Sequence, residues 1–214
     1  MTHATLEVVR HPLIEHKLSF LRDKRTGSRQ FRALLEEITL LLTFHAARHL
    51  KGKEVTFDTP LETMRARRIR EDRLVVVPIL RAGLGMVEGV LRLIPGARVG
   101  HLGFFRNEET LQPVRYYGKL PPEPAGRSFL LVDPMLGTGG TAAAATSELK
   151  QHGAREIRLM CLVAAPEGAA RMAETHPDVP VYTAALDRRL SDVGYILPGL
   201  GDAGDRIFGT LPGA

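Results

Sequence analysis

The chain has 214 residues, of which 44% are hydrophobic and 25% are charged. This length suits one well-buried domain spanning residues 1–214 and does not require a second. No apolar run approaches the roughly 18 residues of a membrane span, and the N-terminus has no uninterrupted apolar core. The single cysteine, Cys161, lies within an apolar run and has no intramolecular disulfide partner. We therefore expect a cytoplasmic protein with no membrane contact.

The formal net charge of +5 has two interpretations. An excess of cations suits nucleic acid, but it equally suits a small substrate that carries several phosphates. The most basic segment, MRARRIREDR at 64–73, also contains Glu71 and Asp72. We interpret it as a solvated helical face, and we expect no nucleic-acid partner.

Predicted helices and strands alternate along most of the chain. In order, they are a helix at 28–50, a strand at 74–80, a helix at 82–94, a strand at 97–105, half of a protruding hairpin at 114–120, a strand at 128–133, a helix at 141–153, a strand at 156–165, a helix at 166–176 and a strand at 179–186. This alternation predicts an α/β fold with a mostly parallel twisted sheet flanked by helices on both faces. Ligands of such folds bind beyond the carboxyl ends of the strands, which places 78–83 and 133–141 on one functional rim.

The glycine-rich stretch VDPMLGTGGT at 132–141 leads from a strand into a helix. A Walker-type phosphate loop needs a lysine after its last glycine, and this stretch has none. A dinucleotide fingerprint is formally present as Gly137, Gly139 and Ala142. Its companion acid, Glu156, would lie at the beginning of the next strand, on the wrong rim.

A third interpretation gives Asp133 a role. A carboxylate at a strand end can accept hydrogen bonds from the 2′ and 3′ hydroxyls of a ribose. The loop amides and the hydroxyls of Thr138 and Thr141, at the N-terminus of a helix, would then hold a 5′-phosphate of the same sugar. This interpretation predicts a site for a ribose 5-phosphate.

An apolar strand, an acid and a T-G-G-T loop together resemble the 5-phosphoribosyl 1-diphosphate (PRPP) motif of type I phosphoribosyltransferases, in particular that of the uracil phosphoribosyltransferase family. Other stretches similar to that family, in the same order, are HPLIEHKLSFLRD at 11–23, VVPILRAGLGM at 76–86, FRNEETLQPV at 105–114, LVAAPEG at 162–168 and GYILPGLGDAGDRIFGT at 194–210. Most type I members carry a second acid where this chain has Pro134. Gly137 and Thr141 stand where many members have Ala and Ser.

The resemblance implies the phosphoribosyltransferase type I fold, with an N-terminal helical segment and a protruding β-hairpin arm. It also implies the reaction of uracil with PRPP to give UMP and diphosphate, with Mg²⁺ bound mainly through PRPP and water and no metal ligand from the protein. The implied PRPP-binding residues are Arg81, Arg106, Asp133, Pro134, Met135, Leu136, Gly137, Thr138, Gly139, Gly140, Thr141 and Asp202. The implied uracil-binding residues are Ile196, Gly201, Asp202 and Ala203.

Several features complete the expectation. Tyr116 and Tyr117 are a candidate lid that would exclude water. The resemblance implies a homo-oligomer, a dimer or higher, and GTP activates some members of the family. His45 and His49 are four residues apart but lack the glutamate of a zinc protease, and we interpret them as structural or surface residues.

Two alternative functions stay open. One is a phosphoribosyltransferase-like RNA-binding regulator, against which the intact base-recognition tail at 194–210 argues. The other is a PRPP-dependent enzyme for a different base. Pro134 argues against a purine-specific member, because those usually carry paired acids at this point.

Overall fold

The computed structural model describes residues 5–106 and 113–210. Within these ranges the chain forms a nine-stranded sheet whose main path is β1-β11-β10-β8-β4-β6-β7. These strands are β1 (Leu6–Val8), β11 (Val181–Leu186), β10 (Glu156–Ala164), β8 (Ser128–Val132), β4 (Leu74–Leu80), β6 (His101–Arg106) and β7 (Pro113–Lys119). Two short strands join the path, β5 (Arg98–Val99) beside β4 and β9 (Met135–Leu136) beside β10. All these pairs are parallel except β6 with β7, which confirms the predicted mostly parallel sheet.

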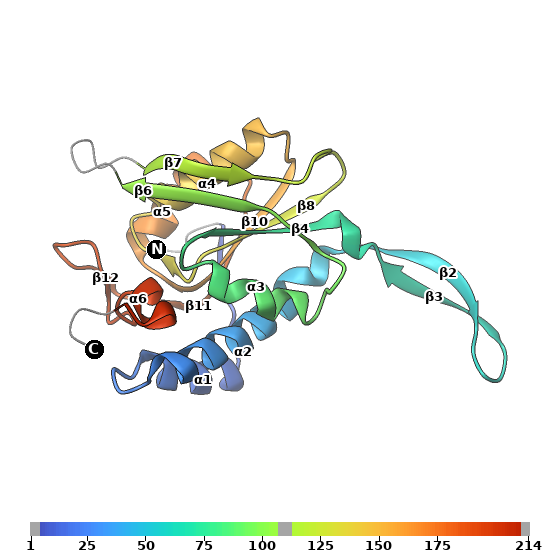
Figure 1. The fold of residues 1–214 in the computed structure, drawn as a ribbon, viewed down its shortest axis with the longest axis horizontal. Helices are drawn as coiled ribbons and strands as arrows, with labels where there is room; N and C mark the ends of the chain where they lie inside the picture. Colours follow the sequence, from blue (N-terminus) through green and yellow to red (C-terminus); the bar gives the residue numbers. More distant parts are fainter. Residues whose placement is uncertain (1–4, 107–112, 211–214) are drawn as a thin grey trace.

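Helices cover both faces of the sheet (Figure 1). On one face lie α1 (Pro12–Arg22), α2 (Ser28–Ala46) and α3 (Leu84–Leu91), and on the other lie α4 (Gly140–Gln151) and α5 (Pro166–Thr175). A strand between two helical layers is buried on both sides, which explains why β4 and β8 are continuous apolar runs. Helix α2 buries Phe31, Leu35, Ile38 and Leu42 at helical spacing against this sheet.

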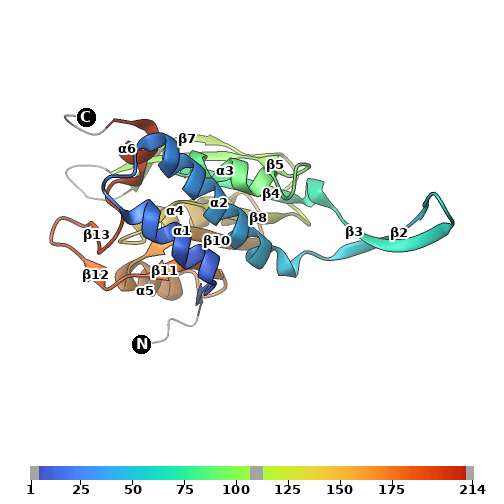
Figure 2. The same ribbon diagram turned by 90° about the horizontal axis from the view of Figure 1, so that it is seen from below.

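An antiparallel hairpin of β2 (Gly52–Asp58) and β3 (Thr63–Ile69) extends far from the body of the molecule (Figure 2). Residues 64–73 were expected to form a helical face, and this prediction was wrong: they form β3 and the 3-10 turn η2 (Glu71–Arg73). Across the hairpin, Arg65 Nη1 lies 3.4 Å from Glu54 Oε1, and the Arg68 guanidinium lies 4.6 Å from the ring centre of Phe57. Because both faces of the arm meet solvent, its sequence shows no apolar period that distinguishes a strand from a helix.

The protruding hairpin is therefore the segment 52–69 and not the one expected at 114–120. The latter residues belong to β7, which runs antiparallel to β6 along the edge of the main sheet (Figure 1). Smaller differences concern element ends: the helix expected at 28–50 is α2 followed by the 3-10 turn η1 (Ala47–His49), and the strand expected at 97–105 is divided into β5 and β6.

The C-terminal tail lies at the carboxyl end of the sheet. It consists of the short hairpin β12 (Arg189–Leu190) and β13 (Ile196–Leu197), then a loop and the helix α6 (Ala203–Phe208). Among the described helices, none combines the length and the apolar character that crossing a membrane requires.

Candidate active site

A pocket of about 220 Å³ opens at the carboxyl rim of the sheet, between the loop after β8 and the C-terminal tail. Its lining residues are Ala82, Asp133, Met135, Gly137, Gly194, Tyr195, Ile196, Gly201, Asp202, Ala203 and Gly204. The structure thus brings residues expected to bind PRPP and all the residues expected to bind uracil to the wall of one pocket. These two groups are separated by about 60 residues in the chain.

The loop after β8 is fixed to its neighbour β10. The Asp133 amide donates to the Met160 carbonyl at 3.2 Å, and the Pro134 carbonyl accepts from the amides of Leu162 and Val163 at 3.0 and 3.1 Å. Pro134 and Leu136 are buried, so they shape the loop from behind and do not line the pocket. This pairing holds Asp133 at the rim, where the residue as a whole is partly buried.

Burial raises the pKa of the Asp133 carboxyl to about 7, and a hydrogen bond from the Met135 backbone only partly opposes this effect. No cation pairs with Asp133 among the ion pairs of the described residues. A carboxyl that is desolvated and unpaired in a concave site is typical of a group reserved for a ligand.

The loop then turns into the N-terminus of α4. Gly139 has a φ of +74°, and an added Cβ would lie 2.9 Å from the Gly168 carbonyl oxygen, so a residue with a side chain is strained there. Thr138 is exposed at the turn, and Gly140 and Thr141 begin the helix. The first amides of a helix have no intrahelical acceptors, so this turn offers donors to an anion.

Arg81 follows β4 directly, on the same rim. Its side chain is 61% exposed, with Nη2 3.8 Å from Asp205 Oδ1 and the guanidinium 5.7 Å from the ring centre of Phe208. The turn that carries it packs against β8, since a Cβ added to Gly83 would lie 2.5 Å from the Val132 carbonyl oxygen. The backbone of Arg81 is thus placed next to the Asp133 loop while its side chain stays available.

Arg106 is the last residue of β6, and the following residues 107–112 lie outside the described part of the chain. Tyr116 and Tyr117 lie on β7, half-exposed, and neither lines the pocket. The Tyr116 ring covers Gly103, because a Cβ added there would be 2.6 Å from Tyr116 Cζ. Their role as a lid therefore stays a prediction.

Glycines and small or buried side chains make up much of the tail's share of the pocket wall. Ile196 and Ala203 are only 4% and 3% exposed, and Gly201 has a φ of +80°. Asp202 is the N-cap of α6, and its Oδ1 accepts from the Asp205 amide at 2.9 Å. Small side chains and a fixed backbone leave peptide groups free to meet a flat ring at close range.

Sequence reasoning expected 78–83 and 194–210 to contribute to the site but did not single out several of its residues. Ala82 and Gly204 line the pocket beside predicted residues, and Tyr195, half-exposed, lies next to Ile196 in the tail. Arg171 on α5 passes beside the loop after β8: its Nη1 lies 3.5 Å from a Cβ built on Gly140. No sequence signal distinguishes Arg171 from the other exposed arginines, because its position depends on how α5 packs.

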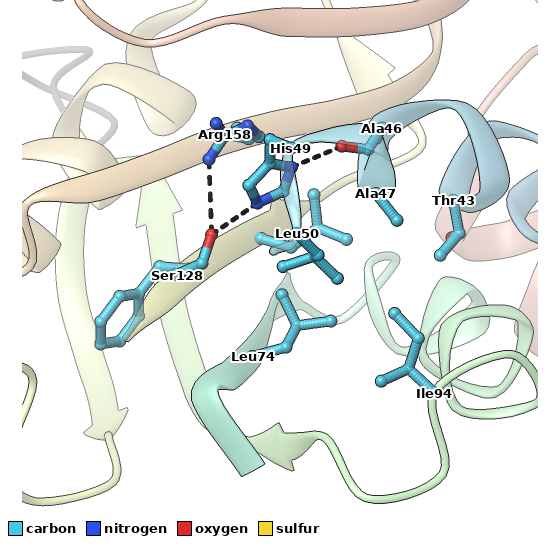
Figure 3. Close-up of a pocket in the computed structure, with 11 residues that line it drawn as sticks. Thr43, Ala46, Ala47, His49, Leu50, Leu74, Ile94, Ser128 and Arg158 are labelled. Carbon is cyan, nitrogen blue, oxygen red and sulfur yellow. Dashed lines mark hydrogen bonds between the residues drawn. The ribbon is translucent and has the colours of Figure 1, made fainter. Parts of the chain in front are cut away.

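A second recess lies at the opposite ends of the strands (Figure 3), and its volume of about 10 Å³ barely admits a water molecule. His49 joins the Ala46 carbonyl at 2.7 Å through Nδ1 and Ser128 Oγ at 2.9 Å through Nε2. Desolvation by burial lowers the pKa of His49, so the neutral ring donates from Nδ1 and accepts from the serine hydroxyl. These partners satisfy the histidine, and the recess is part of the packing.

The other expectations about histidine and cysteine agree with the structure. His45 contacts Glu7 at 2.5 Å and Cys161 is buried, as expected of structural residues. Within the described ranges, no group of three or more His, Cys, Asp or Glu side chains could hold a metal ion.

The parallel sheet, the acid at the end of β8 and the glycine-rich start of α4 define a class of protein, the phosphoribosyltransferases of type I fold. A hypoxanthine-guanine phosphoribosyltransferase of Bacillus anthracis shares this fold with a TM-score of 0.52 at 14% sequence identity, over 75% of this chain and 80% of that one. A solved structure from Aquifex aeolicus has a TM-score of 0.91 at 40% identity, over 95% of this chain and 97% of that one.

Sequence comparison narrows the class to one family. The family model described as uracil phosphoribosyltransferase matches residues 8–210. A uracil phosphoribosyltransferase of Geobacillus kaustophilus is 56% identical over 94% of this chain and 96% of its own. One of Macrococcus caseolyticus is 54% identical over 97% of this chain and 99% of its own. The chain belongs to the uracil phosphoribosyltransferase family.

Proposed function

We propose that this protein is a pyrimidine salvage enzyme that transfers the 5-phosphoribosyl group of PRPP to N1 of uracil, giving UMP and diphosphate. The bond from ribose C1 to the diphosphate oxygen breaks, the bond from C1 to uracil N1 forms, and the N1 proton leaves. The observation that carries this proposal is the pocket that joins the Asp133 loop to the Ile196–Ala203 tail. One wall suits a ribose phosphate and the other suits a flat base.

The Asp133 loop supports binding of the ribose and its 5′-phosphate. Asp133 would accept the 2′ and 3′ hydroxyls, while the amides and hydroxyls at Thr138–Thr141 would hold the phosphate at the N-terminus of α4. The carboxylate and the anion site face opposite ends of one sugar, so they need not repel each other. Hydroxyl donors would also replace the water that Asp133 has lost, which favours its ionised form when the substrate is bound.

Two arginines would bind the diphosphate. Arg81 is exposed on the rim, and its 3.8 Å contact with Asp205 is longer than a hydrogen bond. Arg106, at the end of β6, is the second cation that the family motif implies. Guanidinium groups make paired, charge-assisted hydrogen bonds with phosphate oxygens, and they stabilise the charge that develops as diphosphate leaves.

The tail would recognise uracil through its backbone at Ile196, Gly201 and Ala203. Peptide amides and carbonyls in fixed positions match the alternating donors and acceptors of the uracil edge. Cytosine presents the reversed polarity at its 4-position and would leave buried groups unpaired, a mismatch that can discriminate by about 10⁴ or more. Asp202, between them on the pocket wall, is our candidate for assisting loss of the N1 proton.

The donor set fits Mg²⁺ held chiefly by its substrate. Among the described residues that line the pocket, the carboxylates are Asp133 and Asp202, and Mg²⁺ takes few protein ligands where phosphates and water are available. When bound, Mg²⁺ would neutralise part of the negative charge of the diphosphate. Either carboxylate would contact its water shell.

We also propose a cytoplasmic homo-oligomer. Leu61 at the tip of the arm is 95% exposed and Phe44 on α2 is 73% exposed, so both side chains are available to contact a second copy of the chain. GTP as an effector stays a prediction, as does the dimeric or higher state.

The test is to incubate the pure protein with PRPP, Mg²⁺ and uracil and to measure UMP and diphosphate, with cytosine, adenine and orotate in parallel. We expect UMP and diphosphate in equal amounts from uracil alone. Bound PRPP with no nucleotide from any base would reject the enzymatic proposal and favour the regulatory alternative.

A further inference from the structure

A nearly buried ion pair lies behind the base-side wall of the pocket. Arg22, the last residue of α1, donates to both carboxylate oxygens of Asp187, from Nη1 to Oδ2 at 2.8 Å and from Nη2 to Oδ1 at 2.7 Å. Asp187 directly follows β11, and its side chain is 6% exposed. Two parallel hydrogen bonds of this kind fix orientation as well as distance.

The same pair holds both sides of one residue of the tail. The Gly199 amide donates to Asp187 Oδ2 at 2.9 Å, and the Gly199 carbonyl accepts from Arg22 Nη1 at 2.6 Å. Arg22 and Asp187 thus determine where Gly199 lies and how it is turned. Ile196 and Gly201, which line the pocket, are three residues before it and two residues after it.

A second arginine also connects the tail to the end of α1, but this arginine belongs to the tail and its acceptors include residues of α1. Arg206 of α6 donates to the carbonyls of Leu21 and Leu200 at 2.7 and 2.8 Å, and to that of Asp23 at 2.7 Å. Its guanidinium lies 4.4 Å from the ring centre of Phe31. One arginine of α1 therefore holds the tail, and one arginine of the tail holds the C-terminal end of α1 and the residue that follows it.

General stabilisation does not explain this arrangement well. A buried ion pair is weak support for stability, because its desolvation cost offsets much of its attraction, and apolar residues often serve as well. What a buried ion pair does provide is a fixed position for the groups that hydrogen-bond to it. A base read by backbone peptides has no side chain to adjust, so recognition depends on whatever holds the backbone to within about 0.5 Å.

We propose that Arg22 and Asp187 are positioning residues for the base: by holding both peptide groups of Gly199, they set the geometry of the uracil-recognition tail. This inference rests on the proposed function. It assigns a role in base affinity to an ion pair that does not line the pocket.

The first variant is R22K, which keeps the charge but loses the paired geometry and the hydrogen bond to Gly199. Loss of about one hydrogen bond of fixed geometry corresponds to roughly tenfold in affinity. We expect the KM for uracil to rise about tenfold, with kcat and the KM for PRPP within about twofold of the unchanged chain. D187N, which retains an oxygen for the Gly199 amide but leaves Arg22 without a carboxylate, is expected to raise the KM for uracil further.

A readout that needs no turnover accompanies the kinetics. Amide hydrogen exchange of the free protein should quicken at Gly199–Ala203 in R22K and D187N, while the amides of β8 keep their rates. The control is I14V, which removes a buried methyl group from the same helix. It should lower the melting temperature without changing the exchange of the tail relative to β8 or the KM for uracil.

Each outcome decides the matter. Faster exchange confined to the tail together with a selective rise in the uracil KM would support the proposal. Unchanged tail exchange would overturn it, and so would equal rises in the KM values for uracil and PRPP. If the unchanged chain forms no UMP, the proposed function fails and the claim about base affinity fails with it, while exchange still shows whether the ion pair orders the tail.

Discussion

The carbonyl oxygen of Gly137 lies against Gly168, the third residue of α5, so closely that no side chain fits between the loop after β8 and the helix. A Cβ built on Gly168 would stand 2.8 Å from the Leu136 carbonyl oxygen and closer still to that of Gly137. The start of helix α5 therefore packs directly against the backbone of this loop and supports it. The contact between Gly137 and Gly168 brings together two motifs that are distant in the sequence, VDPMLGTGGT and LVAAPEG.

Gly168→Ala tests this support. The added methyl group must displace the loop, and overpacking of this kind costs about 1–3 kcal/mol. We expect a lower melting temperature and a rise of about tenfold or more in the KM for PRPP, with a smaller change in the KM for uracil. The control is Gly27→Ala, where a Cβ meets nothing within 4 Å and φ is −70°. Equal kinetic constants in Gly168→Ala and the unchanged chain would contradict the prediction.

The glycine-rich loop after β8 and the sheet could be predicted from the sequence because their signals are local. Continuous apolar runs mark β4 and β8, and glycines between a strand and a helix mark the loop. The arm could not be predicted in the same way. Its residues meet solvent on both faces, so 64–73 carried charges without the alternation that identifies a strand.

The rest of the site depends on contacts that are distant in the chain. Arg22 and Gly199 are 177 residues apart, and no local pattern connects them. Arg171 lies beside Gly140 only because α5 packs against the loop after β8. Motifs therefore identify the residues that would touch the substrate, whereas the residues that hold those in place require the fold.

Asp133→Asn should change the pH dependence of stability. The pKa of Asp133 in the folded protein is about 7, above its ordinary value of 3.8, so the folded state binds this proton more tightly than the unfolded state does. Protonation of Asp133 therefore contributes to the stability of the folded protein; this contribution is complete below about pH 4 and is lost as the pH rises towards 7.

The asparagine variant lacks this titration. Its free energy of unfolding relative to that of the wild-type protein should therefore rise between pH 5 and pH 7.5, by at most about 1.4 kcal/mol for each pH unit, and its relative melting temperature should rise with it. Thermal unfolding at a series of pH values measures the difference. A difference that stays constant across that range would show that Asp133 titrates normally. The variant should meanwhile bind PRPP poorly at every pH, because an amide replaces the acceptor of two hydroxyls.

Arg81→Lys tests the proposed diphosphate contact. Lysine keeps the charge but lacks the planar fork that makes paired hydrogen bonds with phosphate oxygens. We expect kcat/KM for PRPP to fall by about tenfold or more and inhibition by diphosphate to weaken. The stability of the protein should be nearly unchanged, because the side chain is 61% exposed. Arg92→Lys, at the ion pair of α3 with Glu36, is the matched control. A loss of uracil affinity alone in Arg81→Lys would assign the residue to the base.

Arg171→Gln tests a cation that the sequence did not single out. The guanidinium lies beside Gly140, where α4 begins, and no ion pair occupies it among the described residues. If the Arg171 guanidinium attracts the 5′-phosphate, the variant should raise the KM for PRPP several-fold. A higher ionic strength should reduce the difference, because the group is exposed.

Ribose 5-phosphate as a competitive inhibitor isolates this contact, since it carries the phosphate without the diphosphate. We expect its inhibition constant to rise in Arg171→Gln and to stay near that of the unchanged chain in Arg81→Lys. The reverse order would place Arg171 at the other end of the sugar.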